Sequence, residues 1–311
     1  MHQRSAPLVD LSFLADTLVR STPLIIAGLA VALAFRGGVF NIGAEGQLLA
    51  GAIAGTAVAL RAGETLGNAT PAVALLAAAI AGATWAAIAA ELRQRFRVLE
   101  IISTIMLNFI AIHLVSFLVR GPLQEPQRIY PQTPSITEAA RLPLMLPGTR
   151  LHAGFAIAVV LALILAWFFR STAAGFRIRA AGAAPRAAWS AGRIDVGRTS
   201  YRVFLLSGAL AGIAGGVEVT GVTFALYENI SPGYGYTAIA VALIAGLNPL
   251  GVIASGIFFG ALETGAIALQ REFAIPSSIA SVTEAALILT VLAVASLRGR
   301  VIPGLAKAGA R

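Results

Sequence analysis

Polar side chains stand inside an apolar run near the start of the chain, where they could contact a polar solute. The run FNIGAEGQLLAGA, residues 40–52, carries Asn41 and Glu45. A carboxylate at bilayer depth is costly, so it persists where it faces protein or water. One interpretation places both residues on a translocation pathway. The other is local capping, in which Asn41 accepts hydrogen bonds from the first-turn amides and Glu45 complements the positive end of the following helix.

A second polar group lies in the run EIISTIMLNFIA. Glu100, Thr104 and Asn108 recur every four residues, so on a helix they share one face. That face either lines the same pathway or only fixes the packing of helices through hydrogen bonds between them. We predict the pathway role for this group as well as for the first.

Three further acids stand in apolar segments. Glu218 and Glu263 are single carboxylates. The simpler interpretation is that each pairs with an arginine or a backbone group of a neighbouring helix. The more specific interpretation is a proton relay. Glu284 follows Ser281 by three residues, which is the spacing of a capping box and predicts a helix start there.

Several kinds of chemistry are excluded by what the sequence lacks. It has no cysteine, and its three histidines, His2, His113 and His152, share no metal-ligand spacing, so we expect neither a metal nor a cofactor. No G-x-x-x-x-G-K-[ST] motif and no set of nucleophile, base and orienting residue is present. The sequence therefore predicts no enzyme, and any ATP hydrolysis is expected on a separate subunit.

The elements that hold these residues are predicted from composition. Of 311 residues, 58% are hydrophobic and 12% charged, and the mean hydropathy is +0.83, far from the roughly 25% charged residues of soluble domains. This composition indicates an integral membrane protein in contact with lipid. The net charge of +9 does not indicate a nucleic-acid partner, because the arginines fall between apolar runs instead of forming one face.

Apolar runs of about 17–25 residues predict spanning helices. They cover residues 45–60, 71–91, 98–119, 151–169, 201–223, 250–270 and 279–297. Two shorter runs, 22–35 and 235–247, are expected to dip part-way into the membrane. The predicted fold class is an all-α polytopic transmembrane bundle of about nine spanning or re-entrant helices, forming one domain over residues 1–311.

Basic residues in short loops predict the orientation of the bundle. Arginines cluster at 93–97, at 170–202 and, with Lys307, in the C-terminal tail, so these segments are expected in the cytoplasm. The segment 120–150 is then external, and its six prolines predict an irregular cap instead of a long helix. The N-terminus also falls outside, so either residues 8–20 form an interfacial helix or an upstream helix precedes this chain, which we favour.

The chain contains an internal echo. AVALAFRGGVFNIGAEGQLLAGAIAG, from Ala30, aligns without a gap with AVALIAGLNPLGVIASGIFFGALETG, from Ala240. A pseudo-twofold repeat would give each half a helix, a break and a long return helix, with Asn248 and Pro249 at the second break. Paired breaks of this kind point to a transport site near the midplane, and the alternative is chance similarity among Ala, Gly and Leu.

Small and aromatic residues have simpler predicted roles. Glycines repeat every four residues at 208, 212 and 216, at 256 and 260, and at 51 and 55, which predicts close helix packing. Phe224, Tyr227, Tyr234 and Tyr236 are predicted to form an interfacial belt, with a stacking platform for a ring-shaped solute as the alternative.

The predicted cytoplasmic segment 170–202 is too patterned for a simple linker. Its run GFRIRAAGAAPRAAWSAGRI, residues 175–194, predicts two short helical pieces separated at Gly182 to Pro185. This run resembles the coupling segment of permeases in bacterial ATP-binding-cassette importers for ribose, branched-chain amino acids and nucleosides. AFRGGVFNIGAEGQLLAGA, EIISTIMLNFIA and GLNPLG are similar to the nucleoside branch, and the resemblance extends from about Thr17 to Arg300.

The resemblance implies about ten helices, a second permease, ATPase subunits and an external solute-binding lipoprotein or periplasmic protein, in the bacterial inner membrane. It assigns ATPase docking to Gly182, Pro185, Ala187, Ala188 and Gly192, and it places Asn41, Glu45, Glu100 and Asn108 near the pathway. Members of this branch usually have another helix before the position of Thr17.

We therefore expect the permease subunit of an ATP-driven importer, with a nucleoside as the first candidate solute and a free base or simple sugar as others. The alternative is a self-contained secondary transporter that uses Glu45, Glu218 or Glu263 as a proton or ion site. A channel-like or scaffold subunit is a third, weaker alternative.

Overall fold

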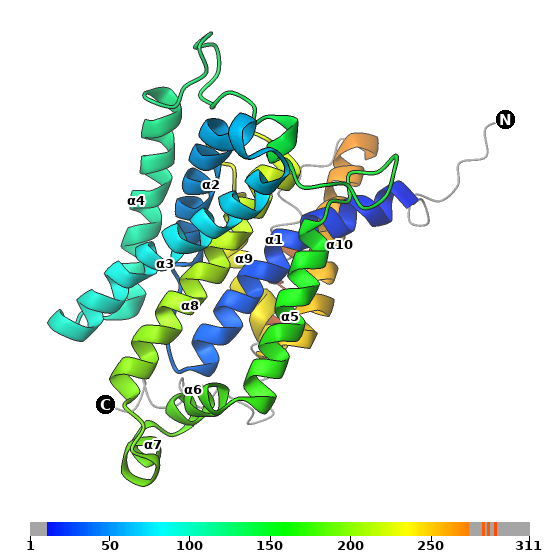
Figure 1. Ribbon diagram of the computed structural model, residues 1–311. Helices are drawn as coiled ribbons and strands as arrows, with labels where there is room; N and C mark the ends of the chain where they lie inside the picture. The colour runs from blue at the N-terminus through cyan, green and yellow to red at the C-terminus, as the bar shows by residue number, and fades with distance from the viewer. Residues whose placement is uncertain (1–10, 274–281, 284, 287–288, 291–311) are drawn as a thin grey trace.

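The computed structural model describes residues 11–273, 282–283, 285–286 and 289–290 (Figure 1). Within these residues the chain consists of helices and loops, which confirms the all-α bundle. The helices, in chain order, are α1 Leu11–Arg36, α2 Ala44–Leu66, η2 Gly67–Ala69, α3 Thr70–Phe96, α4 Glu100–Arg120, η3 Glu138–Ala140, α5 Gly154–Ser171, α6 Ala173–Ala183, α7 Pro185–Gly192, α8 Val196–Val217, the π-helical η4 Glu218–Thr223, α9 Tyr234–Ile244 and α10 Pro249–Phe273.

The long helices have the length and surface of membrane spans. Within the described residues, six apolar segments are long enough to cross a bilayer, and one of them, Ala44–Phe96, contains both α2 and α3. Large apolar side chains on α4 and α5 are exposed, among them Phe109, Phe117 and Trp167. A soluble protein rarely exposes such contiguous apolar surface, so these faces fit contact with lipid. The predicted span 279–297, the Ser281 and Glu284 capping box and the basic tail lie outside the described residues, apart from a few isolated positions of the span.

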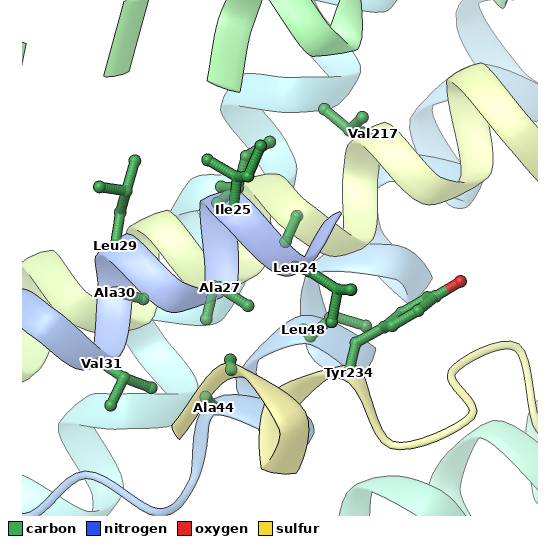
Figure 2. Packing of buried hydrophobic residues seen from close by; sticks show 14 of the residues in the cluster. Leu24, Ile25, Ala27, Leu29, Ala30, Val31, Ala44, Leu48, Val217 and Tyr234 are labelled. Carbon is green, nitrogen blue, oxygen red and sulfur yellow. The ribbon is translucent and has the colours of Figure 1, made fainter. Parts of the chain in front are cut away.

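Helix α1 corrects the expectation of a short run at 22–35. It is one helix of 26 residues, 83% buried over its apolar window, and residues 11–20 continue it instead of forming a separate interfacial helix. Figure 2 shows Leu24 of α1 in one cluster with Leu48 of α2 and Tyr234 of α9. The prediction failed because Asp16 and Arg20 interrupt the apolar run without ending the helix. The other short run is a short helix as expected, since α9 has 11 residues, about 16 Å of helix, and its depth in the membrane stays a prediction.

Glycines bring α2, α3 and α8 together, as their spacing predicts. A Cβ atom at Gly212 would lie 2.1 Å from the carbonyl oxygen of Ala78, and one at Gly51 would lie 2.3 Å from the carbonyl oxygen of Gly212. Gly208 is equally close to Gly82. Backbones at such distances leave no room for a side chain, so these glycines set the packing of the bundle centre.

Each end of the bundle carries a different kind of segment. Residues 121–153 form an irregular cap with only one short 3-10 turn, as predicted. It pairs with η4 and the residue after it, through Leu142 N to Thr220 O and Ile136 N to Phe224 O. Helices α6 and α7 lie at the opposite end (Figure 1). Arg93, at the end of α3, pairs with Glu100 there. Two of the three basic clusters predicted to share one side, 93–97 and 170–202, therefore lie at one end, and the third lies outside the described residues.

Both halves of the internal echo contain a helix, a break and a long return helix, but the two breaks differ. Asn248 is exposed at the second break, where its side-chain oxygen accepts from Leu250 N at 3.1 Å. Asn41 at the first break is completely buried. The first break is therefore the one that places polar groups inside the bundle.

Candidate functional site

The segment between α1 and α2, residues 37–43, folds back into the bundle. Asn41 donates to the Ser207 hydroxyl on α8 at 2.8 Å, and Ser207 donates to the carbonyl of Ala30 at 2.8 Å. Ala30 lies six residues before the end of α1 at Arg36, which is about 9 Å along the helix. Non-helical backbone at this depth needs partners for its polar groups, and side chains provide them.

Asn41 holds the break from inside. Its Nδ2 donates to Gln47 Oε1 at 2.9 Å and to Ser207, while its Oδ1 accepts from Gly43 N at 2.9 Å and from Gln47 Nε2 at 3.0 Å. An asparagine side chain has two donors and an acceptor with two lone pairs, so Asn41 is fully used. It caps the approach to α2 through Gly43, which agrees with the local interpretation of this residue.

One face of α4 holds the same break from the other side. Glu100 accepts from Phe40 N at 2.8 Å and also pairs with Arg93. Thr104 bonds only to carbonyls of its own helix, and its Cβ lies 3.0 Å from the place of a Cβ at Gly43. The predicted common face of Glu100, Thr104 and Asn108 therefore exists, and it runs along the break.

Asn108 caps α2 from a neighbouring helix. Helix α2 begins after Gly43, which supplies no side-chain cap. Asn108 Oδ1 accepts from Gly46 N at 2.8 Å, and Asn108 Nδ2 donates to the carbonyl of Ile42 at 3.0 Å and to the Tyr236 hydroxyl at 3.2 Å. It thus supplies a partner for one of the first-turn amides that every helix leaves open.

Glu45 lies between the starts of two helices. It stands in the first turn of α2, and its Oε2 accepts from Gly235 N, in the first turn of α9, at 2.7 Å. A negative charge is favourable at a helix N-terminus, and here one carboxylate serves two. Glu45 also lines a cavity of about 260 Å³ together with Ser116, Glu228 and Ser231.

The structure thus gathers all five predicted pathway residues around one break. Their hydrogen bonds within the described residues go to protein groups, which fits the capping and packing interpretations. Glu45 lines the cavity of about 260 Å³. The pathway role of the group stays a prediction. Sequence reasoning missed Ser207, which is 166 positions from its partner Asn41, and no local signal marks it.

The predicted coupling segment forms α6 and α7, which separate at Ala184, within the expected interval. Pro185 opens α7, Ala187 and Gly192 are exposed, and Ala188 is buried where its carbonyl accepts from Ile194 N. Trp189, which the sequence analysis did not single out, is 69% exposed on α7. Helix α7 therefore presents one apolar side chain and several small residues at the tip of this end.

Gly182 connects this segment to the centre of the bundle. A Cβ atom at Gly182 would lie 2.1 Å from the carbonyl oxygen of Arg36 and 2.8 Å from Gly38 N. The end of α6 is thus in direct backbone contact with the end of α1 and with the start of the break.

Glu218 lies at a larger cavity toward the opposite end. This cavity has a volume of about 480 Å³ and is lined by the first turns of α1, by η4 and by the loop 224–233. Tyr227 and Tyr234 line it, and Tyr234 is 5% exposed. These two rings therefore do not form a simple interfacial belt. Tyr236 instead is 41% exposed and bonds to Asn108.

The loop 224–233 is tied to α4 by charge. Arg120 donates to both oxygens of Glu228 at 2.6 and 2.7 Å, and Ser116 donates to the same carboxylate. The hydrogen bonds from Arg120 and Ser116 lower the pKa of Glu228 to about 2. Glu228 is therefore charged at neutral pH and fixes the loop beside both cavities.

Spanning helices, a buried break, a half-length helix and two cavities define a multi-pass membrane transport protein. Residues 13–295 match the family described as branched-chain amino acid transport system / permease component, and the chain belongs to this family. It is a transport component of the permease type, which confirms the recognition from its motifs and the expectation that it is not an enzyme.

Relatives with named solutes agree with this class. The chain is 39% identical to a glucose ABC transporter permease of Haloferax volcanii over 90% of this chain and 76% of the relative. It is 36% identical to a guanosine ABC transporter permease of Bacillus subtilis, over 93% and 83%, and 31% identical to a nucleoside ABC transporter permease of Lactococcus lactis, over 89% and 78%. No solved structure shows a significant match.

Proposed function

We propose that this chain is the membrane-embedded permease of an ATP-driven importer in the cytoplasmic (inner) membrane. It works with a second permease, with ATPase subunits that dock at α6 and α7, and with an external solute-binding protein. The solute is small, polar and neutral, with a nucleoside as the first candidate and a simple sugar as the second. The names of the guanosine, nucleoside and glucose relatives support this choice.

The contact between Gly182 and Arg36 carries the proposal. Because the end of α6 touches the backbone at the end of α1 without an intervening side chain, a displacement of α6 and α7 moves α1 and the break together. Packed elements of this kind shift as units instead of deforming. In this proposal Glu45 lines the path, and Asn41, Glu100, Thr104 and Asn108 hold the break in register as it moves.

The docking surface is Trp189 together with Ala187 and the turn at Gly192. The test replaces Trp189 by alanine in the assembled transporter and measures solute uptake and the ATPase activity stimulated by the binding protein. We expect both to fall strongly, because an exposed aromatic side chain at an interface is often a dominant contact. The matched control is Tyr130→Ala, which removes a 61% exposed aromatic side chain in the loop at the opposite end.

Two outcomes would overturn the proposal. Unchanged coupling in Trp189→Ala, Pro185→Ala and Gly192→Ala would remove the docking role of α7. Uptake by the purified chain alone in liposomes, driven by an ion gradient, would instead favour the secondary transporter. A competition assay with guanosine and glucose distinguishes the two solute candidates.

A further inference from the structure

The cavity of about 480 Å³ lies beside irregular backbone. Helix α8 continues into the six-residue π-helix η4, and Phe224 and Asn229 then adopt φ values of 58° and 59°. π-helical turns occur frequently at functional sites. At membrane depth, irregular backbone is tolerated where it is buried in protein or lines a water-filled cavity. The size of this cavity falls within the range of about 300–1,000 Å³ that is usual for small-molecule sites.

Glu218 brings a free hydrogen-bond acceptor to this cavity. Its side chain is 3% exposed, and its Oε2 has no hydrogen-bond partner among the described residues. Buried polar atoms without partners are rare in native proteins, and each one calls for an explanation. Glu45 provides the contrast, because its carboxylate accepts from the first turn of α9. A ligand in the cavity would supply the partner that the protein does not.

The other lining residues define the kind of ligand. Asp16, Arg20 and Arg150 share the cavity with Glu218, so two acids and two bases face it, and Glu218 interacts electrostatically with both arginines and with Glu263 of α10. A lining of mixed sign favours a solute without net charge. Tyr227 and Tyr234 add aromatic rings, which prefer offset or edge contacts with another ring.

We propose that this cavity is the site where the permease itself binds its solute. The Glu218 carboxylate accepts hydrogen bonds from adjacent O–H or N–H donors, and Tyr227 and Tyr234 lie against the ring of a neutral nucleoside. This assignment rests on the proposed function and adds the site within it. A phosphorylated solute is excluded from the class, because the two acids and two bases of the lining offer no net positive charge to match it.

A labelling experiment tests the site directly. Because the chain has no cysteine, Val222→Cys places a single thiol on the cavity wall. We expect guanosine to slow its reaction with a maleimide in the assembled transporter, and glucose to do so only if the sugar is the solute. Ile129→Cys, on a 70% exposed loop position, is the control and should react at the same rate with or without solute.

A second measurement tests Glu218 itself. Glu218→Ala removes the acceptor that the solute would use and should raise the KM for uptake roughly tenfold. Glu218→Gln keeps one acceptor oxygen and should have a smaller effect. Glu64→Gln, which changes an exposed acid on α2, should leave the KM unchanged.

The outcomes separate this inference from the proposed function. In one outcome, the unmodified transporter takes up guanosine while guanosine fails to protect Val222→Cys and Glu218→Ala leaves the KM for uptake unchanged. In that case the proposed site is wrong and the proposed function stands. If the unmodified transporter takes up neither guanosine nor glucose, the proposed solute class and this site fail together. If the Glu218 variants do not fold, the labelling of Val222→Cys alone decides.

Discussion

Asn108 offers a sharp test of how the break is held. Replacing Asn108 by alanine removes the acceptor for Gly46 N and the donor for the carbonyl of Ile42. Gly46 is buried and Ile42 is half-buried in the segment that leads into α2, so the amide of Gly46 has no water to replace the lost partner. The change therefore strands two backbone groups while it deletes only a small side chain.

The magnitude follows from these two groups. A buried donor or acceptor left without a partner costs about 1–3 kcal/mol, which gives about 2–6 kcal/mol for the pair. Hydrogen bonds measured within membrane bundles average only about 0.6 kcal/mol and reach about 1.7, because the unfolded chain in the bilayer also finds partners. We therefore expect a destabilisation of about 1–3 kcal/mol, or a drop in Tm of roughly 2–12 °C by the scaling for large domains.

Thermal unfolding in detergent, followed by loss of monodisperse protein, measures this effect. Thr104→Ala is the matched control, since it truncates a side chain of similar size on the same face of α4, and its hydroxyl bonds only to carbonyls of its own helix. We expect a drop in Tm at least twofold smaller for the control. Equal shifts in the two variants would refute the assignment of Asn108 as the cap of α2.

Further predictions concern the packing and the pH response. Gly212→Ala should strongly reduce the yield of folded protein, because its Cβ would lie 2.1 Å from the carbonyl oxygen of Ala78. The control Gly265→Ala should leave the yield unchanged, because a Cβ there meets nothing within 4 Å. Equal yields for the two variants would contradict the close packing. Burial and the charge of Arg150 lower the pKa of His152 to about 4, below the value of about 6.5 for an unfolded chain. The unfolded state then binds more protons, so the free energy of unfolding should fall as the pH drops from 6.5 to 4, by at most about 1.4 kcal/mol per pH unit. Unfolding measured against pH checks this, and His152→Phe should lack the part of the pH dependence that His152 contributes.

Local patterns were sufficient to predict the face of α4 and the place of the break. The four-residue spacing of Glu100, Thr104 and Asn108 fixes their common face once the segment is helical. The run of Gly and Asn between two apolar stretches predicts the end of one helix and the start of the next. The sequence also predicts α6 and α7, because Pro185 favours the first position of a helix.

Partners distant in sequence were not predictable. Asn41 meets Ser207 across 166 positions, and Glu45 meets Gly235 across 190. Pattern reasoning identifies a costly polar residue but not the group that compensates for it. For this reason Asn41 and Glu218 look alike in sequence as polar residues in apolar runs, whereas the structure gives Asn41 four hydrogen bonds and leaves one oxygen of Glu218 without any.

This difference in hydrogen-bond partners suggests different tasks for the break around Asn41 and for the cavity at Glu218. Asn41, being fully bonded, is suited to holding backbone in place, while Glu218, with an acceptor to spare, is suited to a solute. Helix α1 joins the two regions, because Arg36 touches α6 and Asp16 lines the large cavity. These two residues are 20 positions apart on one helix, a distance of about 30 Å. A motion imposed at α6 can therefore reach the cavity along one continuous helix, which also contacts the break at its other end.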